Sequence, residues 1–428
     1  MADLHRLTAS RASQLIRAGE LSAEALTRAC LERAIAREGE VRAWAFLDPQ
    51  AALDQAQALD AAPARGRLHG LPVGIKDVIL TRDMPTQYNS PFHRGSHPEV
   101  DAACVSLLRS AGAVLLGKTE TVEFAATGRK PPTRNPHDRA RTPGASSSGS
   151  AAAVADFHVP LALGTQTAGS VIRPASYCGV WGFKPTWGLA STEGAKRFAT
   201  TLDTLGWFAR SAEDLDLMLD VFDPDPPEPQ SAFDVRGARI AVCRTPAWDQ
   251  AEPATRQALA AAAERLAAAG AEVVHLALPP PFDGLPAAVA RIMSAEGRAA
   301  FLPEFRAAPE LLDEALHGIV TNASGVSRAE QLEAYDLAGE CRGAFARLAA
   351  PFDAVLAPST TGEAPVGLGF TGSPVFNGLW TLLHTPCVNV PGFVGSNGIP
   401  VGLTVTGPRF ADRRVLAAAE AFGPVFAT

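Results

Sequence analysis

Three segments in the first half of the chain carry residue types that suit acyl-transfer chemistry. Lys76 follows residues 73–75, which read as a buried strand, and it is one of only five lysines in the sequence. Ser146 lies in a Gly- and Ser-rich loop at 142–155, where small residues let the backbone approach a ligand closely. Ser170 follows a Thr-Ala-Gly turn, and successive backbone N–H groups there can form the anion-binding nest that an oxyanion requires.

A phosphate-binding interpretation of residues 112–119 is weaker. The letters GAVLLGKT match G-x-x-x-x-G-K-[ST], whose backbone amides wrap a phosphate only when the segment is a flexible loop after a strand. Here the apolar residues between the glycines predict a strand, and the segment before them predicts a helix. Nucleotide binding through residues 112–119, with Lys118 as the phosphate-binding lysine, is therefore only an alternative function, from a different class than acyl transfer.

The order of the first three motifs resembles the amidase signature family. The resemblance is carried by GIKD around Lys76, the Ser-rich stretch at 144–150, TAGS ending at Ser170, and CGVWGFKPT at 178–186. It is clearest from about residue 68 to residue 210, and the N-terminal helices and the WTLLHTPCVNVPGF stretch extend it to nearly the whole chain. Within the family, SSSGS and GTQT-x-GSVIRP are most similar to malonamidase-type amidases.

The resemblance implies a catalytic triad and an oxyanion hole, with no metal and no cofactor. Ser170 would attack the amide carbonyl, Ser146, which follows a cis peptide bond in the family, would relay the proton, and Lys76 would accept it. A serine hydroxyl is a poor nucleophile until a base removes its proton, and a lysine is a base only when burial keeps it neutral. The oxyanion hole would consist of the backbone N–H groups of Thr167, Ala168, Gly169 and Ser170.

Departures from the family pattern bear on this expectation. Ala145 and Ser148 replace glycines of the usual G-G-S-S-G-G-S, and Ala168 replaces the first of two glycines before the nucleophile. An alanine still supplies an N–H group, but a left-handed backbone at that position would be strained. Gln166 stands where many members have Asp, so acidic support of the loop is in question.

Arg173, three residues after Ser170, is the candidate substrate-binding residue. A planar guanidinium binds a carboxylate through two hydrogen bonds, and in malonamidase-like enzymes the matching arginine holds the free carboxylate of the substrate. The resemblance therefore implies a short dicarboxylic monoamide such as malonamate. The alternative is that Arg173 only braces the loop that carries it.

The elements around these motifs predict an α/β fold, a central mixed sheet covered by helices on both sides. Strands are expected near residues 73–75, 113–116, 160–164, 239–243, 271–275, 354–357, 387–390 and 401–406. DPDPPEPQ at 223–230 predicts a linker, and the strand-poor section 285–350 predicts a helical insertion or cap. We expect a single amidase signature domain over residues 1–428.

Composition excludes several other classes of protein. A hydrophobic fraction of 47% and a net charge of −7 exclude intrinsic disorder and give no bulk attraction to nucleic acid. No apolar run is long enough for a transmembrane helix, and the charged N-terminus lacks a signal-peptide pattern, so a cytoplasmic protein is expected. The six scattered cysteines form no CxxC pair and are expected to be free thiols.

The function expected from these observations is hydrolysis of a linear carboxamide through an acyl-enzyme on Ser170. The expected partner is a small-molecule amide, with no nucleic acid, no membrane, and a homodimer left open. A second enzyme alternative is the amidase subunit of a tRNA-dependent amidotransferase, which needs partner chains. A third alternative is a binding protein without catalysis.

Overall fold

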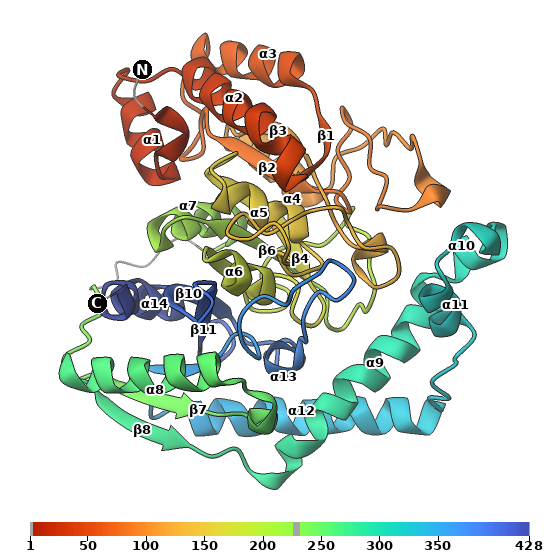
Figure 1. The fold of residues 1–428 in the computed structure, drawn as a ribbon, viewed down its shortest axis with the longest axis vertical. Helices are drawn as coiled ribbons and strands as arrows, with labels where there is room; N and C mark the ends of the chain where they lie inside the picture. Colours follow the sequence, from red (N-terminus) through yellow and green to blue (C-terminus); the bar gives the residue numbers. More distant parts are fainter. Residues whose placement is uncertain (1–2, 226–231, 428) are drawn as a thin grey trace.

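The computed structural model describes residues 3–225 and 232–427, and its strands form one mixed sheet of eleven strands through the middle of the molecule (Figure 1). In spatial order the strands are β1 (Trp44–Leu47), β3 (Val114–Thr119), β2 (Pro72–Lys76), β4 (Leu161–Gln166), β6 (Thr204–Ala209), β5 (Trp181–Lys184), β10 (Cys387–Val394), β11 (Pro400–Thr406), β9 (Ala354–Pro358), β7 (Arg239–Cys243) and β8 (Glu272–Leu276). β2 is parallel to β3 and β4, and β7 is parallel to β8 and β9. In this spatial order, every neighbouring pair from β4 to β9 is antiparallel, and β1 is antiparallel to β3. Such a mixed sheet is the α/β architecture that the sequence predicts.

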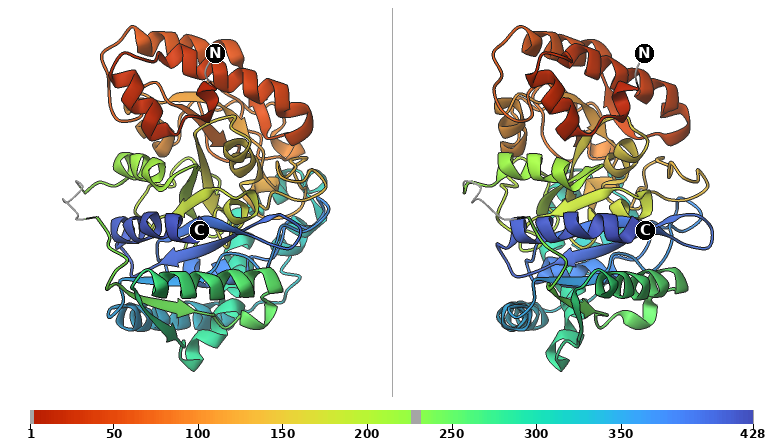
Figure 2. Two further views of the ribbon diagram at one scale, coloured as in Figure 1. Left: turned by 60° about the vertical axis from the view of Figure 1, so that its left-hand side comes forward. Right: turned by 90° about the vertical axis from the view of Figure 1, so that its left-hand side faces the viewer.

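The N-terminal helices form one end of the molecule, and α8 lies toward the other (Figure 2). The N-terminal helices are α1 (Ala9–Arg17), α2 (Ala23–Val41) and α3 (Pro49–Asp60). The next helix along the chain is α4 (Ala103–Ser110). A short break separates α1 from α2, and Ser22 caps α2 by accepting a hydrogen bond from Ala25 N.

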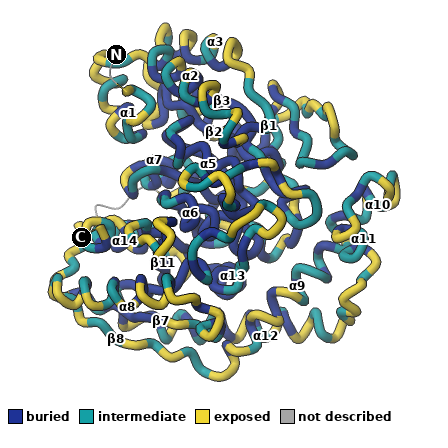
Figure 3. Tube along the Cα trace, in the orientation of Figure 1, coloured by how far each residue is buried: buried dark blue, intermediate teal, exposed yellow. Residues whose placement is uncertain are grey.

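Three helices in the middle of the molecule flank the strands that carry the motifs and are mostly buried (Figure 3). They are α5 (Ser148–Ala155), α6 (Ile172–Cys178) and α7 (Ala212–Phe222). Small residues let α5 pack closely: a Cβ added at Gly149 would lie 2.2 Å from Ala43 O. α5 starts inside the Ser-rich loop, and α6 starts two residues after Ser170.

Helices cover both faces of the C-terminal part of the sheet. In β7, Ile240 and Val242 belong to the apolar cluster that includes α8 and α14, whereas Ala241 and Cys243 belong to the cluster that includes α9, α12 and α13. This alternation follows from the two-residue period of a strand. The covering helices are α8 (Pro253–Ala268), α9 (Leu285–Ala300), α12 (Arg328–Ala349), α13 (Val375–Leu382) and α14 (Asp412–Ala427). Two further helices, α10 (Leu302–Ala307) and α11 (Glu314–Val320), pack against α9.

Residues 285–350 are largely helical, since α9 to α12 occupy them and extend to one side of the molecule in Figure 1, and their role as an insertion or cap stays a prediction. Residues 226–230 of the predicted linker lie outside the described residues. The expectation of a single domain over 1–428 stays a prediction. None of the helices in the described part of the chain combines the length and apolar character that a membrane span requires.

Short 3-10 helices complete the described secondary structure. They span Leu4–Arg6, Pro91–His93, Glu123–Ala125, Trp248–Gln250, Pro280–Gly284 and Pro309–Leu311. All six cysteines are free and buried, as expected from their scattered positions.

Candidate active site

Two parallel strands bring the predicted lysine to the edge of the sheet where the serine loops lie. β2 ends at Lys76 and its parallel neighbour β4 ends at Gln166, so their carboxyl ends meet at the same edge. Lys76 is fully buried, and its Nζ lies 2.8 Å from Ser146 Oγ and 2.9 Å from Thr165 Oγ1. The structure thus brings Lys76 and Ser146 into direct hydrogen-bond contact.

Burial holds the pKa of Lys76 well below its usual value, because removal from water disfavours the ammonium form. The carboxylate of Asp203 acts in the opposite direction and raises this pKa, but with the smaller effect. No carboxylate is bonded to Lys76 among the described residues; its partners are hydroxyl and carbonyl oxygens. This environment favours a neutral amine that can accept a proton.

The Ser-rich loop contains a cis peptide bond between Ala145 and Ser146, at the position that the family resemblance implies. The other serines of the loop hold the backbone: the hydroxyl groups of Ser147, Ser148 and Ser150 donate to the carbonyl oxygens of Thr165, Gly144 and Leu163, respectively. Of these four serines, Ser146 is the one whose hydroxyl contacts Lys76.

Ser170 lies between β4 and α6 and is 8% exposed. Gln166 supports this turn, because its Oε1 accepts hydrogen bonds from Val171 N at 2.8 Å and Ile172 N at 3.0 Å. Its Nε2 donates to Thr381 Oγ1 on α13. The side-chain oxygen of Gln166 therefore binds the two N–H groups that follow Ser170. The turn is supported even though Gln166 replaces the Asp that many family members have at this position.

The backbone before Ser170 presents unpaired donors. Among the described residues, the N–H groups of Thr167, Ala168, Gly169 and Ser170 have no hydrogen-bond acceptor. Buried backbone N–H groups without a partner are rare in proteins, so these four predicted donors are suited to bind an oxyanion. Ala168 does not have a positive φ, and the strain considered for an alanine there is absent.

Asp203 and Thr381 fix this segment from two sides, and neither residue was identified from the sequence. Thr167 Oγ1 donates to Asp203 Oδ1 at 2.6 Å, and Asp203 Oδ2 accepts from the backbone N–H groups of Phe198 and Ala199. Thr381 Oγ1 donates to the carbonyl oxygen of Ala168. Neither residue belongs to a motif with local spacing, so only the fold brings them to the site.

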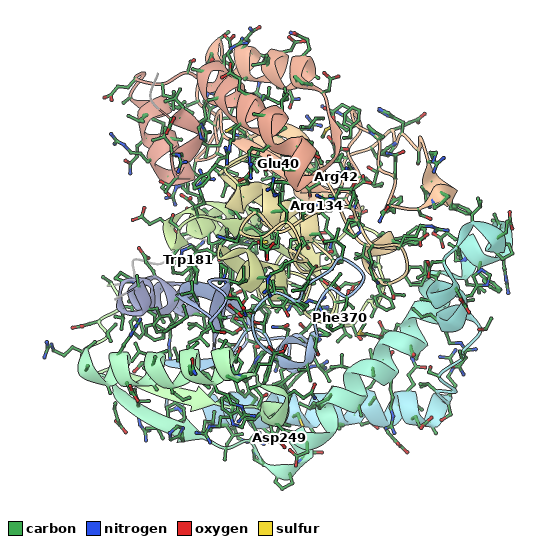
Figure 4. All side chains as sticks on the ribbon, viewed as in Figure 1. Glu40, Arg42, Arg134, Trp181, Asp249 and Phe370 are labelled. Atoms are coloured by element: carbon green, nitrogen blue, oxygen red, sulfur yellow. The ribbon has the colours of Figure 1, made fainter. Side chains whose placement is uncertain are left out.

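Arg173 lies in α6 and is buried. Its Nη2 donates to Ala145 O at 2.6 Å and its Nη1 donates to Gly372 O, while Nε has no partner. Gly372 belongs to a segment before α13 that reaches the surface at the exposed Phe370, which is labelled in Figure 4. Burial lowers the pKa of Arg173 to about 10. Its substrate-binding role stays a prediction, since both terminal nitrogens bind backbone carbonyls.

The alternative phosphate-binding loop is a buried strand. Residues Val114–Thr119 form β3, and Lys118 Nζ donates to Ile79 O at 2.9 Å and to Thr86 Oγ1 at 2.6 Å. Asp77 lies 3.3 Å from the same nitrogen. A lysine held in this way has no hydrogen-bonding group free for a phosphate, so the structure disfavours nucleotide binding at 112–119.

Comparison with known proteins agrees with this fold. A sequence model of the Amidase family matches residues 25–416. A glutamyl-tRNA(Gln) amidotransferase subunit of Chloroflexus aggregans is 35% identical over 99% of this chain and 97% of its own length. A solved amidase is 29% identical with a TM-score of 0.87, covering 97% of this chain and 98% of that chain. The peptide amidase of Stenotrophomonas maltophilia is 27% identical with a TM-score of 0.79, covering 98% and 96%.

The chain belongs to the amidase family and is a hydrolase that acts on carbon–nitrogen bonds. The relatives include both amidotransferase subunits and amidases, and a specific resemblance to malonamidase stays a prediction.

Proposed function

We propose that the protein hydrolyses a linear carboxamide through an acyl-enzyme on Ser170, with Ser146 as proton relay and Lys76 as general base. The observation that carries this proposal is the 2.8 Å contact between the buried Lys76 Nζ and Ser146 Oγ. The unpaired N–H groups of Thr167, Ala168, Gly169 and Ser170 support it as the oxyanion hole.

In the first half of the reaction, Ser170 Oγ forms a bond to the amide carbon and the carbonyl electron pair moves onto oxygen. The proton of Ser170 passes to Ser146, whose own proton passes to neutral Lys76. The backbone N–H groups stabilise the oxyanion, because preorganised donors cost no rearrangement when the charge develops. When the carbon–nitrogen bond breaks, the leaving nitrogen takes up this proton through the same relay, and an ester to Ser170 remains.

In the second half, water attacks the ester carbon. Its proton travels through Ser146 to Lys76, the bond to Ser170 Oγ breaks, and that oxygen recovers a proton as the acid leaves. Lys76 is thus neutral at the start and at the end of each cycle.

The test of this proposal is covalent trapping combined with substitution. A fluorophosphonate is expected to label Ser170, located by peptide mass spectrometry, and Ser170→Ala is expected to abolish both labelling and turnover with an unchanged far-UV spectrum. Ser147→Ala is the matched control, since Ser147 bonds backbone and has no contact with Lys76. Labelling of Ser146 would reverse the assignment, and a wild-type protein that is neither labelled nor active would favour the binding-protein alternative.

A dicarboxylic monoamide such as malonamate is a second candidate for the substrate. The observation that favours it is that Arg173 is a buried cation with no carboxylate partner among the described residues. If Arg173 binds the free acid, the wild-type enzyme hydrolyses malonamate with a higher kcat/KM than butyramide, a neutral amide of similar length.

The amidase subunit of a tRNA-dependent amidotransferase is the remaining enzyme alternative. It is favoured by the 35% identity to one such protein over nearly the whole chain. This alternative requires partner chains, and the behaviour of the isolated chain distinguishes it from a free-standing amidase.

A further inference from the structure

A cavity of about 620 Å³ opens beside the oxyanion segment and reaches Ala168. Its walls come from α9, α11 and α13, the segments 126–127 and 373–374, and Phe198. This volume lies in the range of roughly 300–1,000 Å³ that is typical of sites for small molecules. It greatly exceeds what a three-carbon acid amide would fill.

The lining of this cavity is apolar and uncharged. Phe198, Val289, Met293, Ile319 and Leu379 supply its large side chains. The polar lining residues carry only hydroxyl groups, and no Asp, Glu, Lys, Arg or His of the described residues lines it; the hydroxyl residues are Thr127, Ser294 and Ser373. A charged substituent would lose its hydration here without gaining a partner.

Charged side chains line a neighbouring cavity but do not line this one. A second cavity, lined in part by the C-terminal half of α9, contains one acidic residue, Glu296, and four basic ones, Lys196, Arg197, Arg298 and Arg328. Arg173 lines neither cavity, and its Nη groups are bonded to backbone carbonyls. The cavity that reaches Ala168 is therefore the apolar one, and the basic side chains line the second cavity.

We propose that the amide substrate carries a large uncharged apolar group, of the size of a phenyl ring or a six-carbon chain, which binds between α9, α11 and α13. The carbonyl oxygen then lies against the N–H of Ala168, where the cavity meets the oxyanion segment. This inference rests on the proposed function and chooses a neutral substrate over the dicarboxylic monoamide.

The first test measures kcat/KM along two series of amides. One series lengthens the acyl group from propionamide to octanamide, and the other lengthens the N-alkyl group of acetamide. Each methylene buried in the cavity is expected to raise kcat/KM about threefold to fourfold in the series whose variable group enters it, and butyramide is expected to exceed malonamate. A flat response in both series, or a preference for malonamate over butyramide, would overturn the inference.

The second test narrows the cavity with a matched pair of variants on α9. Ala290 is exposed and lines the cavity, whereas Ala287 is exposed on the same helix and lines neither cavity. Ala290→Phe is expected to lower the ratio of kcat/KM for the longest to the shortest amide at least tenfold, and Ala287→Phe to leave this ratio unchanged. An unchanged ratio in Ala290→Phe contradicts the proposal.

Failure of the inference and failure of the proposed function give different results. A small fluorophosphonate labels Ser170 whatever group the cavity prefers. Labelling of Ser170 with a flat chain-length response refutes the apolar substrate alone. Absence of both labelling and hydrolysis refutes the proposed function, and the inference falls with it.

Discussion

At the scale of residues, Lys76 differs from an ordinary surface lysine because it is buried and bonded only to neutral oxygens. Lys76→Met removes the proton acceptor and keeps an unbranched apolar side chain of similar length. General-base catalysis contributes about 10²–10⁴-fold, so kcat/KM is expected to fall by that factor. Steady-state kinetics on one amide measures it, and a fully active variant would exclude Lys76 as the base.

The pH dependence follows from the direction of the pKa shift. Lys76 accepts a proton only in its neutral form, so activity is lost as pH falls through its pKa and gained as pH rises. Because burial lowers this pKa, the rising limb of kcat/KM is expected at lower pH than a solvent-exposed lysine would give.

Asp203 acts on Lys76 through charge and on Thr167 through a hydrogen bond. Burial raises the pKa of Asp203 to about 6, so it is ionised above that pH and favours the ammonium form of Lys76. Asp203→Asn removes the charge, and the rising limb of the pH profile is expected to move to lower pH. The maximal rate is also expected to fall. Both carboxylate oxygens of Asp203 accept hydrogen bonds, whereas the side-chain amide of Asn can accept hydrogen bonds only at its oxygen. A lower rate with an unmoved limb would show that Asp203 is only structural.

Motifs fixed by local spacing could be identified from the sequence, and contacts made by the fold could not. Lys76, Ser146 and Ser170 each lie in a short recognisable stretch, and the structure brings Lys76 and Ser146 together. Asp203 and Thr381 reach the same segment from β6's N-terminal side and from α13, and no spacing along the chain connects them to it.

At the scale of elements, Arg173 on α6 joins the Ser-rich loop to the segment before α13. Arg173→Leu leaves the carbonyls of Ala145 and Gly372 without this donor, and a buried acceptor without a partner costs about 1–3 kcal/mol. We expect activity on acidic and neutral amides to fall in parallel. A rise in KM of tenfold to a hundredfold confined to acidic amides would instead assign Arg173 to substrate binding.

The close packing of α5 gives a prediction on stability. A Cβ at Gly149 would lie 2.2 Å from Ala43 O and 2.4 Å from Glu120 N, so neighbouring backbone must move. Gly149→Ala is expected to lower the free energy of unfolding by about 1–3 kcal/mol or more. Gly339→Ala in α12 is the control: nothing lies within 4 Å of its added Cβ, and stability is expected to rise by about 0.5–1 kcal/mol. Equilibrium denaturation measures both, and equal effects would contradict the packing argument.

At the scale of the whole molecule, elements with a continuous apolar run were predictable from the sequence, and elements interrupted by glycine or proline were not. β7 spans Arg239–Cys243, the residues predicted, because RIAVC is an apolar run with defined ends. β5, Trp181–Lys184, has four residues and includes a glycine, and α6 contains Pro174 within seven residues, so neither has a distinctive pattern. Pairing with β6 and β10 stabilises β5, and that pairing depends on residues far away in the chain.

The candidate site is formed by residues of a single chain, and this leads to the last prediction. Lys76, Ser146, the unpaired N–H groups before Ser170 and the apolar cavity are all formed by this chain alone. We therefore expect the purified chain to release ammonia from a primary amide without added proteins or tRNA. An amidotransferase component would need its partner chains for full activity, so the decisive comparison is the rate of the isolated chain before and after their addition. Hydrolysis by material that elutes as this chain alone supports a free-standing amidase, and activity that requires the partners would assign the protein to the amidotransferase.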